Sequence, residues 1–361
     1  MHYAPIPMVP GPVSLHPDVI DALNRDYGSG LIEPDYMALY AATARNLATL
    51  MNTRNDVVIM TGEGMLALWG ALKSCLKPGD GVVCVGTGVF GDGTGDMARS
   101  FGCRVESVSL PYDRSICEKD LDTIADAIRR IRPVMLTAVH CETPSGTLNP
   151  LKALGQLKKD LGVPLFYVDA VASLGGVPVC VDDWHVDLLL GGAQKCLSAP
   201  PSMCMVGVSD AAWERIDAVQ YQGYDALGQF RHIRRDGAPY TPYWHGLAAL
   251  HAATQALFRE GMDNVFARHA RVAARCRAGL AELGIKLWTA PDAINSPTVT
   301  AARIPEGLTE EEWQSRLRAR GLICCGSYGP MKGKVFRLGH MGVQAQDHLM
   351  EQALQVMAEA L

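Results

Sequence analysis

The sequence contains no apolar run that approaches the roughly 20 residues needed for a membrane-spanning helix. Its opening residues, MHYAPIPMVPGP, also lack the basic segment and the apolar core of a secretory leader. The hydrophobic content of 48% is still enough to build a sizeable core in a chain of 361 residues. We therefore expect a globular, soluble protein located in the cytoplasm.

An excess of basic residues is also missing. The chain has 33 Lys and Arg residues against 38 Asp and Glu residues, and its formal net charge is -5. Proteins that bind nucleic acids or anionic membranes usually carry a basic surface. The charge balance argues against both classes of partner, so small molecules are the expected ligands.

The 11 cysteines form no CxxC pair and no Cys/His spacing typical of a zinc site. Their number is odd, and they lie mostly inside apolar runs such as Met203-Cys204-Met205. This pattern favours buried, reduced thiols in a cytosolic protein. We expect no metal site.

What the sequence does contain is a regular alternation of short β-rich runs with helical patterns. The β-rich runs are Val57–Met60, Val82–Val85, Val105–Leu110, Val134–Val139, Leu165–Val168, Val186–Leu190 and Met203–Val208. Strands that are apolar on both faces and separated by helices predict a mainly parallel sheet, here of seven strands, in an α/β domain.

The pattern differs at both ends of the chain. Residues 1–15 carry four prolines, which prevent a regular helix, so we expect an irregular N-terminal segment. Residues 16–245 are expected to form the large domain, with one of its helices near Asp92–Ser100. Residues 246–361 are expected to form a smaller α+β domain, with one of its strands at Leu322–Cys325. The polar and aromatic segment Gln220–Tyr243 predicts an irregular excursion that covers a site or reaches another subunit.

Lys195 is the candidate catalytic residue, because it follows the apolar run Leu188-Leu189-Leu190-Gly191-Gly192-Ala193. A lysine withdrawn from water at a strand end has a lowered pKa. Its neutral amine can then form an imine with an aldehyde. Ligands of doubly wound sheets bind beyond the carboxyl ends of the strands, which is where this amine is expected.

Side chains after four other strands are expected to converge on Lys195. They are Glu63 and Gly64, Phe90, Thr143 and Asp169. A carboxylate such as Asp169 keeps the nitrogen of a pyridoxal ring protonated, so that the ring acts as an electron sink. Phe90 would stack on the ring, and Thr143 would bond its phenolic oxygen. We therefore predict a pyridoxal site with Lys195 and Asp169 as the catalytic pair.

Each of these residues also has a plainer interpretation. Asp169 could be a helix cap or structural carboxylate, Phe90 a core residue, and Thr143 a turn hydroxyl. Glu63 could be a first-turn acid that faces solvent. Their convergence on one sheet edge favours the site. His140 and His340 are expected to be structural.

Two motifs relate the chain to a known family. Asp169-Ala170-Val171-Ala172-Ser173 and Gln194-Lys195-Cys196-Leu197-Ser198-Ala199-Pro200-Pro201, with Pro10-Gly11-Pro12, resemble the class V aminotransferases of fold type I. This family includes the alanine–glyoxylate and serine–pyruvate aminotransferases. The resemblance covers essentially the whole chain. It implies a homodimer with sites at the subunit interface, and Thr241 as a contact across that interface.

Three further stretches are similar to the pyridoxamine–pyruvate aminotransferases of this family. They are Glu142-Thr143-Pro144-Ser145-Gly146-Thr147, Ser296-Pro297-Thr298-Val299-Thr300 and Arg337-Leu338-Gly339-His340-Met341-Gly342. The similarity implies that Glu63, Phe90, Thr143, Lys195 and Arg337 contact ring or substrate, with Phe90 in place of a tyrosine. Arg337 would bind the substrate carboxylate; its plainer interpretation is a surface salt bridge. The loop Gly326-Ser327-Tyr328-Gly329 departs from the pattern, because it lacks an arginine that those enzymes carry nearby.

Glu63 bears on whether the pyridoxal ring carries a phosphate or a free hydroxymethyl group. Family members that use pyridoxal phosphate usually read Gly-Ser-Gly-Thr where this chain reads Gly62-Glu63-Gly64-Met65. A carboxylate there repels a phosphate, whereas it can accept a hydrogen bond from a hydroxymethyl group. The favoured expectation is transfer of the amino group of unphosphorylated pyridoxamine to pyruvate, giving pyridoxal and alanine.

Two alternatives stay open. The first is an alanine–glyoxylate or serine–pyruvate type of aminotransferase that keeps pyridoxal 5'-phosphate bound and tolerates Glu63. The second is a catalytically silent ligand-binding homologue. The presence of both Lys195 and Asp169 argues against the second.

Overall fold

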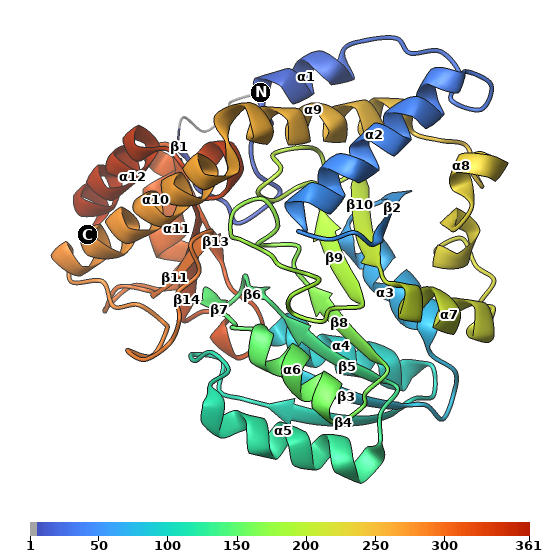
Figure 1. Ribbon diagram of the computed structural model, residues 1–361. Helices are drawn as coiled ribbons and strands as arrows, with labels where there is room; N and C mark the ends of the chain where they lie inside the picture. The colour runs from blue at the N-terminus through green and yellow to red at the C-terminus, as the bar shows by residue number, and fades with distance from the viewer. Residues whose placement is uncertain (1–5) are drawn as a thin grey trace.

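Residues 6–361 of a computed structural model are described below, so the first five residues of the predicted N-terminal segment lie outside the described residues. Figure 1 shows a large domain built on one sheet. The orange and red C-terminal elements gather beside it as a smaller domain. No helix of the described chain has the length and apolar character required to cross a bilayer.

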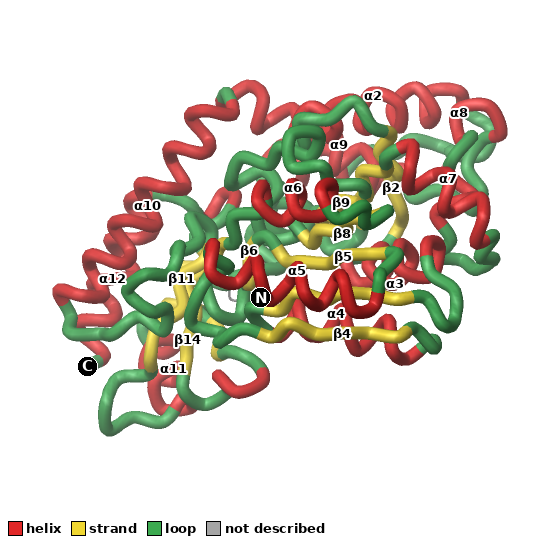
Figure 2. The backbone as a smooth tube through the Cα atoms, turned by 60° about the horizontal axis from the view of Figure 1, so that its bottom comes forward, coloured by secondary structure: helices red, strands yellow, loops and turns green. Residues whose placement is uncertain are grey.

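The large sheet has seven strands in the order β2-β10-β9-β8-β5-β3-β4. Figure 2 shows the labelled strands β9, β8, β5 and β4 following one another in this order. Their bounds are β2 Asp56–Thr61, β3 Gly81–Gly86, β4 Arg104–Ser109, β5 Met135–Val139, β8 Leu165–Asp169, β9 Leu188–Gly192 and β10 Met203–Val208. β10 runs antiparallel to both of its neighbours, and the other six strands share one direction. The predicted mainly parallel, seven-stranded sheet is confirmed.

Both faces of this sheet are covered, which explains why its strands are nearly continuous apolar runs. In β8, Phe166 and Val168 belong to one core, whereas Leu165 and Tyr167 belong to the other. The first core is built mainly from residues of α1 Pro17–Leu23, α2 Pro34–Leu50, α5 Glu118–Ile131, α6 Lys152–Asp160 and α9 Trp244–Glu260, with single buried residues from α8 Ile233–Asp236 and α10 Met262–Glu282. Three helices contribute to the second: α3 Gly64–Cys75, α4 Val89–Ser100 and α7 Asp210–Val219.

The smaller domain contains a three-stranded antiparallel sheet in the order β11-β14-β13. Its elements are α10 Met262–Glu282, β11 Val299–Arg303, α11 Glu310–Ala319, β12 Leu322–Ile323, β13 Cys325–Gly326, β14 Val335–Gly339 and α12 Asp347–Ala360. The single strand predicted over residues 322–325 is wrong in detail. β12 and β13 pair with different partners on either side of Cys324.

The sequence predicts an irregular N-terminal segment, and this prediction is wrong in part. Ile6–Pro7 forms a two-residue strand, β1, which runs parallel to β12. The prolines do exclude a helix, but a short edge strand tolerates them because Pro7 loses only one backbone donor. We call residues 6–13 the N-terminal strap. It leaves the smaller domain at Met8, whose carbonyl accepts from Gly339 N at 2.8 Å, and reaches the large domain at Val13, whose N donates to Gln194 O at 3.1 Å.

The division between the domains at residues 245 and 246 stays a prediction. Trp244, Leu250 and Leu257 of α9 belong to the first core of the large domain. Val272 and Leu280 of α10 belong to the core of the smaller domain. We propose that the division lies within α10.

The excursion Gln220–Tyr243 contains a short 3-10 turn, Leu227–Phe230, and the helix α8, Ile233–Asp236. It is held on α3 by an ion pair between Lys73 Nζ and Asp225 Oδ2 at 2.9 Å. The excursion is therefore a fixed part of the large domain surface next to β2.

Candidate active site

A cavity of about 220 Å³ lies at the carboxyl ends of the parallel strands. Its lining includes every residue that the sequence predicts to contact the ring: Glu63, Gly64, Phe90, Thr143, Asp169 and Lys195. Cys141, Val171 and Gln194 also line it, although their residue types gave no signal in the sequence. The fold thus brings together side chains that follow five different strands.

Lys195 lies in the turn after β9 and lines the cavity. Its Nζ donates a hydrogen bond to the carbonyl oxygen of Pro10 in the N-terminal strap. Burial and, next, the positive charge of Arg337 lower the pKa of the Lys195 amine. A lowered pKa increases the neutral, nucleophilic fraction of the amine.

Asp169 is the last residue of β8, and its Oδ1 accepts a hydrogen bond from Val171 N at 2.8 Å. Burial raises the pKa of Asp169 to about 6, although the hydrogen bond from Val171 and the charge of Lys195 oppose the shift. A carboxylate in such surroundings gains from a cationic partner. A protonated ring nitrogen is such a partner.

Glu63 is the N-cap residue of α3, and its Oε1 accepts a hydrogen bond from Met65 N at 3.0 Å. Unpaired N–H groups and the helix dipole make a helix N-terminus favourable for a negative charge. Gly64 begins the helix, where a Cβ would lie 3.1 Å from Val171 Cγ2. Glu63 thus caps α3 with its side chain and is one of the residues that line the cavity.

Phe90 lies in the first turn of α4, which begins at Val89 and not at Asp92 as the sequence predicts. Glu142 favours this earlier start, because its carboxylate accepts hydrogen bonds from the backbone N of Phe90 and of Gly91. Thr143, the next residue, is buried and lines the cavity. Glu142 gave no signal in the sequence beyond its place in the turn after β5.

Arg337 is a buried residue of β14, only 3% exposed. Its Nε donates to Gly326 O at 2.7 Å, and its Nη1 to Thr143 O at 3.4 Å. Its guanidinium lies over the ring of Tyr328, 4.7 Å from the centroid. Among residues 6–361 no carboxylate pairs with it, which makes Arg337 a candidate binder of a substrate anion. The alternative of a surface salt bridge is not favoured, because the side chain is buried.

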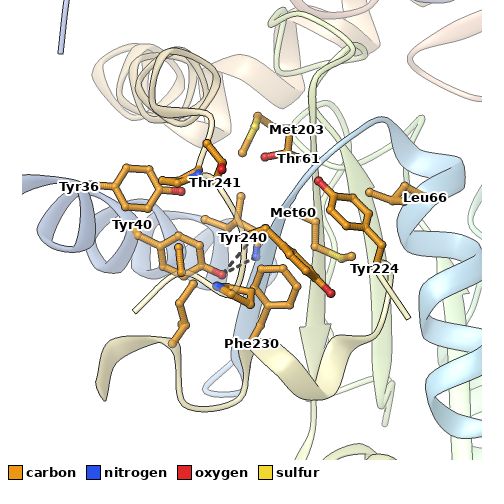
Figure 3. A pocket seen from close by; sticks show the side chains of 15 residues that line it. Tyr36, Tyr40, Met60, Thr61, Leu66, Met203, Tyr224, Phe230, Tyr240 and Thr241 are labelled. Atoms are coloured by element: carbon orange, nitrogen blue, oxygen red, sulfur yellow. Dashed lines mark hydrogen bonds between the residues drawn. The ribbon is translucent and has the colours of Figure 1, made fainter. Parts of the chain in front are cut away.

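Thr241 lies outside the cavity that contains Lys195. It is exposed and lines a second, smaller cavity of about 30 Å³ with Tyr36, Tyr40 and Tyr240 (Figure 3). Within one chain it therefore does not join the predicted site. A contact of Thr241 with the site of another subunit stays a prediction.

Both histidines near the site are buried and hydrogen-bonded. His140 Nδ1 lies 2.9 Å from Ser173 Oγ, and His340 Nε2 lies 2.8 Å from Thr300 Oγ1. Burial lowers the pKa of His140 to about 4 and that of His340 to about 3. These surroundings favour structural roles.

A model of the family described as "Aminotransferase class-V" matches residues 28–329. The chain belongs to the class V aminotransferases. Among curated proteins, this class V aminotransferase is 34% identical to the pyridoxamine–pyruvate transaminase of Mesorhizobium japonicum, over 94% of the chain and 87% of that protein. It is 29% identical to the alanine–glyoxylate aminotransferase of Callithrix jacchus, over 98% of the chain and 86% of that protein.

A solved structure of pyridoxamine–pyruvate aminotransferase from Mesorhizobium loti matches with a TM-score of 0.94 at 32% identity. The match covers 99% of this class V aminotransferase and 92% of the solved chain. Fold type I and aminotransferase activity are thereby confirmed. An amine and a 2-oxo acid are the substrates that this activity requires.

Class V aminotransferases use pyridoxal phosphate. The cavity of this class V aminotransferase fits a pyridoxal ring. Lys195 supplies an amine, Asp169 a carboxylate of raised pKa, and Phe90 an aromatic ring, and all three line the same space. The residues around Glu63 bear on whether the ring carries a phosphate.

Proposed function

We propose that this aminotransferase transfers the amino group of unphosphorylated pyridoxamine to pyruvate, giving pyridoxal and alanine. The observation that carries the proposal is the carboxylate of Glu63 at the N-terminus of α3. A helix N-terminus in such a cavity is the natural binding position of a phosphate, because its N–H groups are free. Here Glu63 already accepts the hydrogen bond from Met65 N.

Simple electrostatics favours a ring whose substituent next to Glu63 is uncharged. At about 4 Å and an effective dielectric constant near 20, one pair of like charges costs roughly 4 kcal/mol. The favourable interaction of a negative charge with a helix N-terminus contributes only about 0.3–1 kcal/mol. Repulsion between Glu63 and a phosphate therefore outweighs the attraction of the helix. A hydroxymethyl group has no charge and can donate a hydrogen bond to Glu63.

The remaining residues have defined tasks in this reaction. A bound pyridoxal ring supplies an electron sink for the electrons left when a substrate carbon loses its proton. Lys195 Nζ, with its lowered pKa, takes that proton from one carbon and returns it to another. Asp169 would accept a hydrogen bond from a protonated ring nitrogen. Phe90 would pack on one face of a bound ring and exclude water there.

Arg337 provides the binding group for the carboxylate of pyruvate or alanine. Carbonyl oxygens of Gly326 and Thr143 hold its guanidinium, so little side-chain freedom is lost when the substrate binds. Tyr328, which lies over this guanidinium, belongs to the loop that lacks the expected second arginine. Arg337 is thus proposed to bind the carboxylate without that arginine.

A second function is supported by the comparisons. The similarity to alanine–glyoxylate aminotransferase extends over 98% of the chain. A pyridoxal-phosphate enzyme of the alanine–glyoxylate or serine–pyruvate type would need Glu63 to turn away from the phosphate or to be protonated. The silent ligand-binding homologue is not favoured, because the chain is an aminotransferase with Lys195 in its cavity.

One comparison of amino donors tests the proposal. Protein freed of bound pyridoxal compounds is mixed with pyruvate and either pyridoxamine or pyridoxamine phosphate, and alanine is measured. We expect kcat/KM for pyridoxamine to be higher by on the order of tenfold or more, given the repulsion at Glu63. A preference for the phosphate compound would show that the first proposal is wrong and favour the second.

The Lys195→Ala variant is the control for the mechanism. Loss of a positioned acid–base group lowers rates by about 10²–10⁴-fold, so transfer from both donors should fall at least that far. Undiminished transfer in this variant would contradict both proposed functions.

We also propose that the protein is a homodimer. Leu31 and Ile32 are 61% and 78% exposed, and Tyr243 is 37% exposed. The turn that carries the first two packs against the excursion, because a Cβ at Gly30 would lie 2.7 Å from Pro242 Cγ. Exposed apolar side chains from two segments that are also close to Thr241 support an interface there.

A further inference from the structure

Glu142 is a buried carboxylate for which the proposed mechanism has no chemical task. Its side chain is completely buried, at 0% exposure. Oε1 accepts a hydrogen bond from Gly91 N at 2.7 Å, and Oε2 accepts one from Phe90 N at 3.3 Å. Both donors belong to the first turn of α4, whereas Glu142 lies in the short strand β6, Cys141–Glu142.

Glu142 provides hydrogen-bond acceptors for the N-terminus of α4. The first N–H groups of a helix have no partner within the helix and are usually satisfied by the N-cap side chain. The N-cap residue of α4 is Gly88, which has no side chain to provide this bond. Glu142 therefore caps α4 from a different strand end.

Two glycines make room for this cap. A Cβ at Gly88 would lie 2.5 Å from Glu142 Cδ, and a Cβ at Gly91 would lie 3.1 Å from Glu142 Oε1. The backbone of Gly88 is extended, at φ 177, so its conformation alone does not require glycine. The approach of the carboxylate explains why Gly88 has no side chain, whereas Gly91 is crowded by Gly86 Cα at 2.9 Å as well as by Glu142.

Burial of this carboxylate is costly for the stability of the folded protein. Burial raises the pKa of Glu142 to about 8, and the nearby carboxylates of Asp169 and Asp92 act in the same direction. The two backbone hydrogen bonds oppose the shift. A buried acid with acidic neighbours lowers stability unless its hydrogen bonds offset the cost.

We propose that Glu142 is a positioning residue that fixes the first turn of α4 and thereby holds the ring of Phe90 against the bound pyridoxal ring. Thr143, which follows Glu142 directly, lines the same cavity. The inference rests on the proposed function only in requiring that a pyridoxal-type ring binds in the cavity.

A double-mutant cycle between Glu142 and Phe90 tests this inference. The protein is titrated with pyridoxal, and in parallel with pyridoxal phosphate, and the absorbance of the protein-bound compound gives an apparent Kd. Glu142→Gln keeps the size of the side chain. Its NH₂ group cannot accept a hydrogen bond from a backbone N–H, and its amide oxygen is a weaker acceptor than a carboxylate oxygen. We expect it, and Phe90→Ala, to raise the Kd of the preferred compound by on the order of tenfold each.

The decisive measurement is the Kd of the variant that carries both substitutions. In the Phe90→Ala background, Glu142→Gln should change the Kd less than about twofold, because residues that act through one another are not additive. Hydrogen exchange of the Phe90 and Gly91 amides should rise in Glu142→Gln. Glu142→Asp, a milder variant whose shorter side chain withdraws from Gly91 N, should show the same effects if Glu142→Gln does not fold.

Asp120→Asn is a matched control. Asp120 is another buried carboxylate that caps a helix, since it accepts from Cys117 N at 2.9 Å at the start of α5, but it does not line the cavity. It should lower thermal stability and leave the Kd unchanged. Additive losses in the cycle, or an equal loss of affinity in Asp120→Asn, would overturn the inference alone. Failure of the wild-type protein to bind either compound would overturn the proposed function and this inference together.

Discussion

Among single residues, Glu63 combines two properties that different groups usually provide. It satisfies a free N–H at the start of α3, as a serine would, and it brings a negative charge to the cavity. Under the proposed function, the stability of the helix and the choice of substrate would therefore depend on the same side chain. The two can be separated, because serine is as good an N-cap as a carboxylate.

The Glu63→Ser variant should keep the fold and lose the repulsion. We expect the ratio of kcat/KM for pyridoxamine to that for pyridoxamine phosphate to fall at least about tenfold, with a nearly unchanged melting temperature. Glu63→Gln, which removes the charge and keeps the length, should change the ratio in the same direction. An unchanged ratio in both variants would mean that Glu63 does not face the ring substituent.

The positions of Lys195, Asp169 and Glu63 in one cavity could be predicted from the sequence, because each lies at or just beyond the end of a buried strand. The shared direction of six strands then places them at one edge. Glu142 could not be predicted as a helix cap, because its partners are backbone groups 51 and 52 residues away in the chain. Contacts of this kind depend on tertiary packing and leave no local pattern.

Among the elements, the N-terminal strap has the most direct effect on the lysine. Its Gly11 has φ +100, and a Cβ there would lie 2.5 Å from Lys195 Cδ and 2.6 Å from Nζ. A side chain at this position would therefore collide with the amine as well as strain the backbone. The strap therefore limits the space around the side chain of Lys195.

The Gly11→Ala variant should impair the reaction of Lys195 with pyridoxal. We expect the lysine-bound fraction, measured by borohydride reduction and mass spectrometry, to require on the order of tenfold more pyridoxal. Gly79→Ala is the control for strain, because Gly79 has φ +89 and no atom within 4 Å of its built Cβ. Equal effects of the two substitutions would show that contact with Lys195 is unimportant.

The inner strands of the large sheet could be predicted because burial on both faces produces continuous apolar runs in the sequence, whereas the edge strand β4 is partly exposed and contains polar residues. β1 and β12 have only two residues each, and neither forms without the other. Such strands carry no periodicity, so their pairing was not predictable. The start of α4 was missed for a related reason, since its cap comes from β6.

In the whole molecule, the expected homodimer would cover the apolar residues around Thr241. We expect light scattering coupled to size-exclusion chromatography to give twice the mass of the 38.9 kDa chain. Ile32→Asp should weaken the dimer by placing a charge in an apolar contact. Leu361→Asp, at a residue 52% exposed in the smaller domain, should not. A monomer in the wild type would contradict the proposal.

The N-terminal strap also has a consequence for the order of synthesis and folding. Val9 O accepts a hydrogen bond from Gln344 Nε2, 335 residues later, and Met8 O accepts one from Gly339 N. Domains generally begin to fold while the chain is still being made. The sheet with Lys195 and Asp169 can form at that stage, together with the bonds of the strap to Gln194 and Lys195, but the bonds of the strap to Gly339 and Gln344 form only after those residues have left the ribosome. A nascent chain would thus carry a reactive lysine whose surroundings are completed at the end of translation.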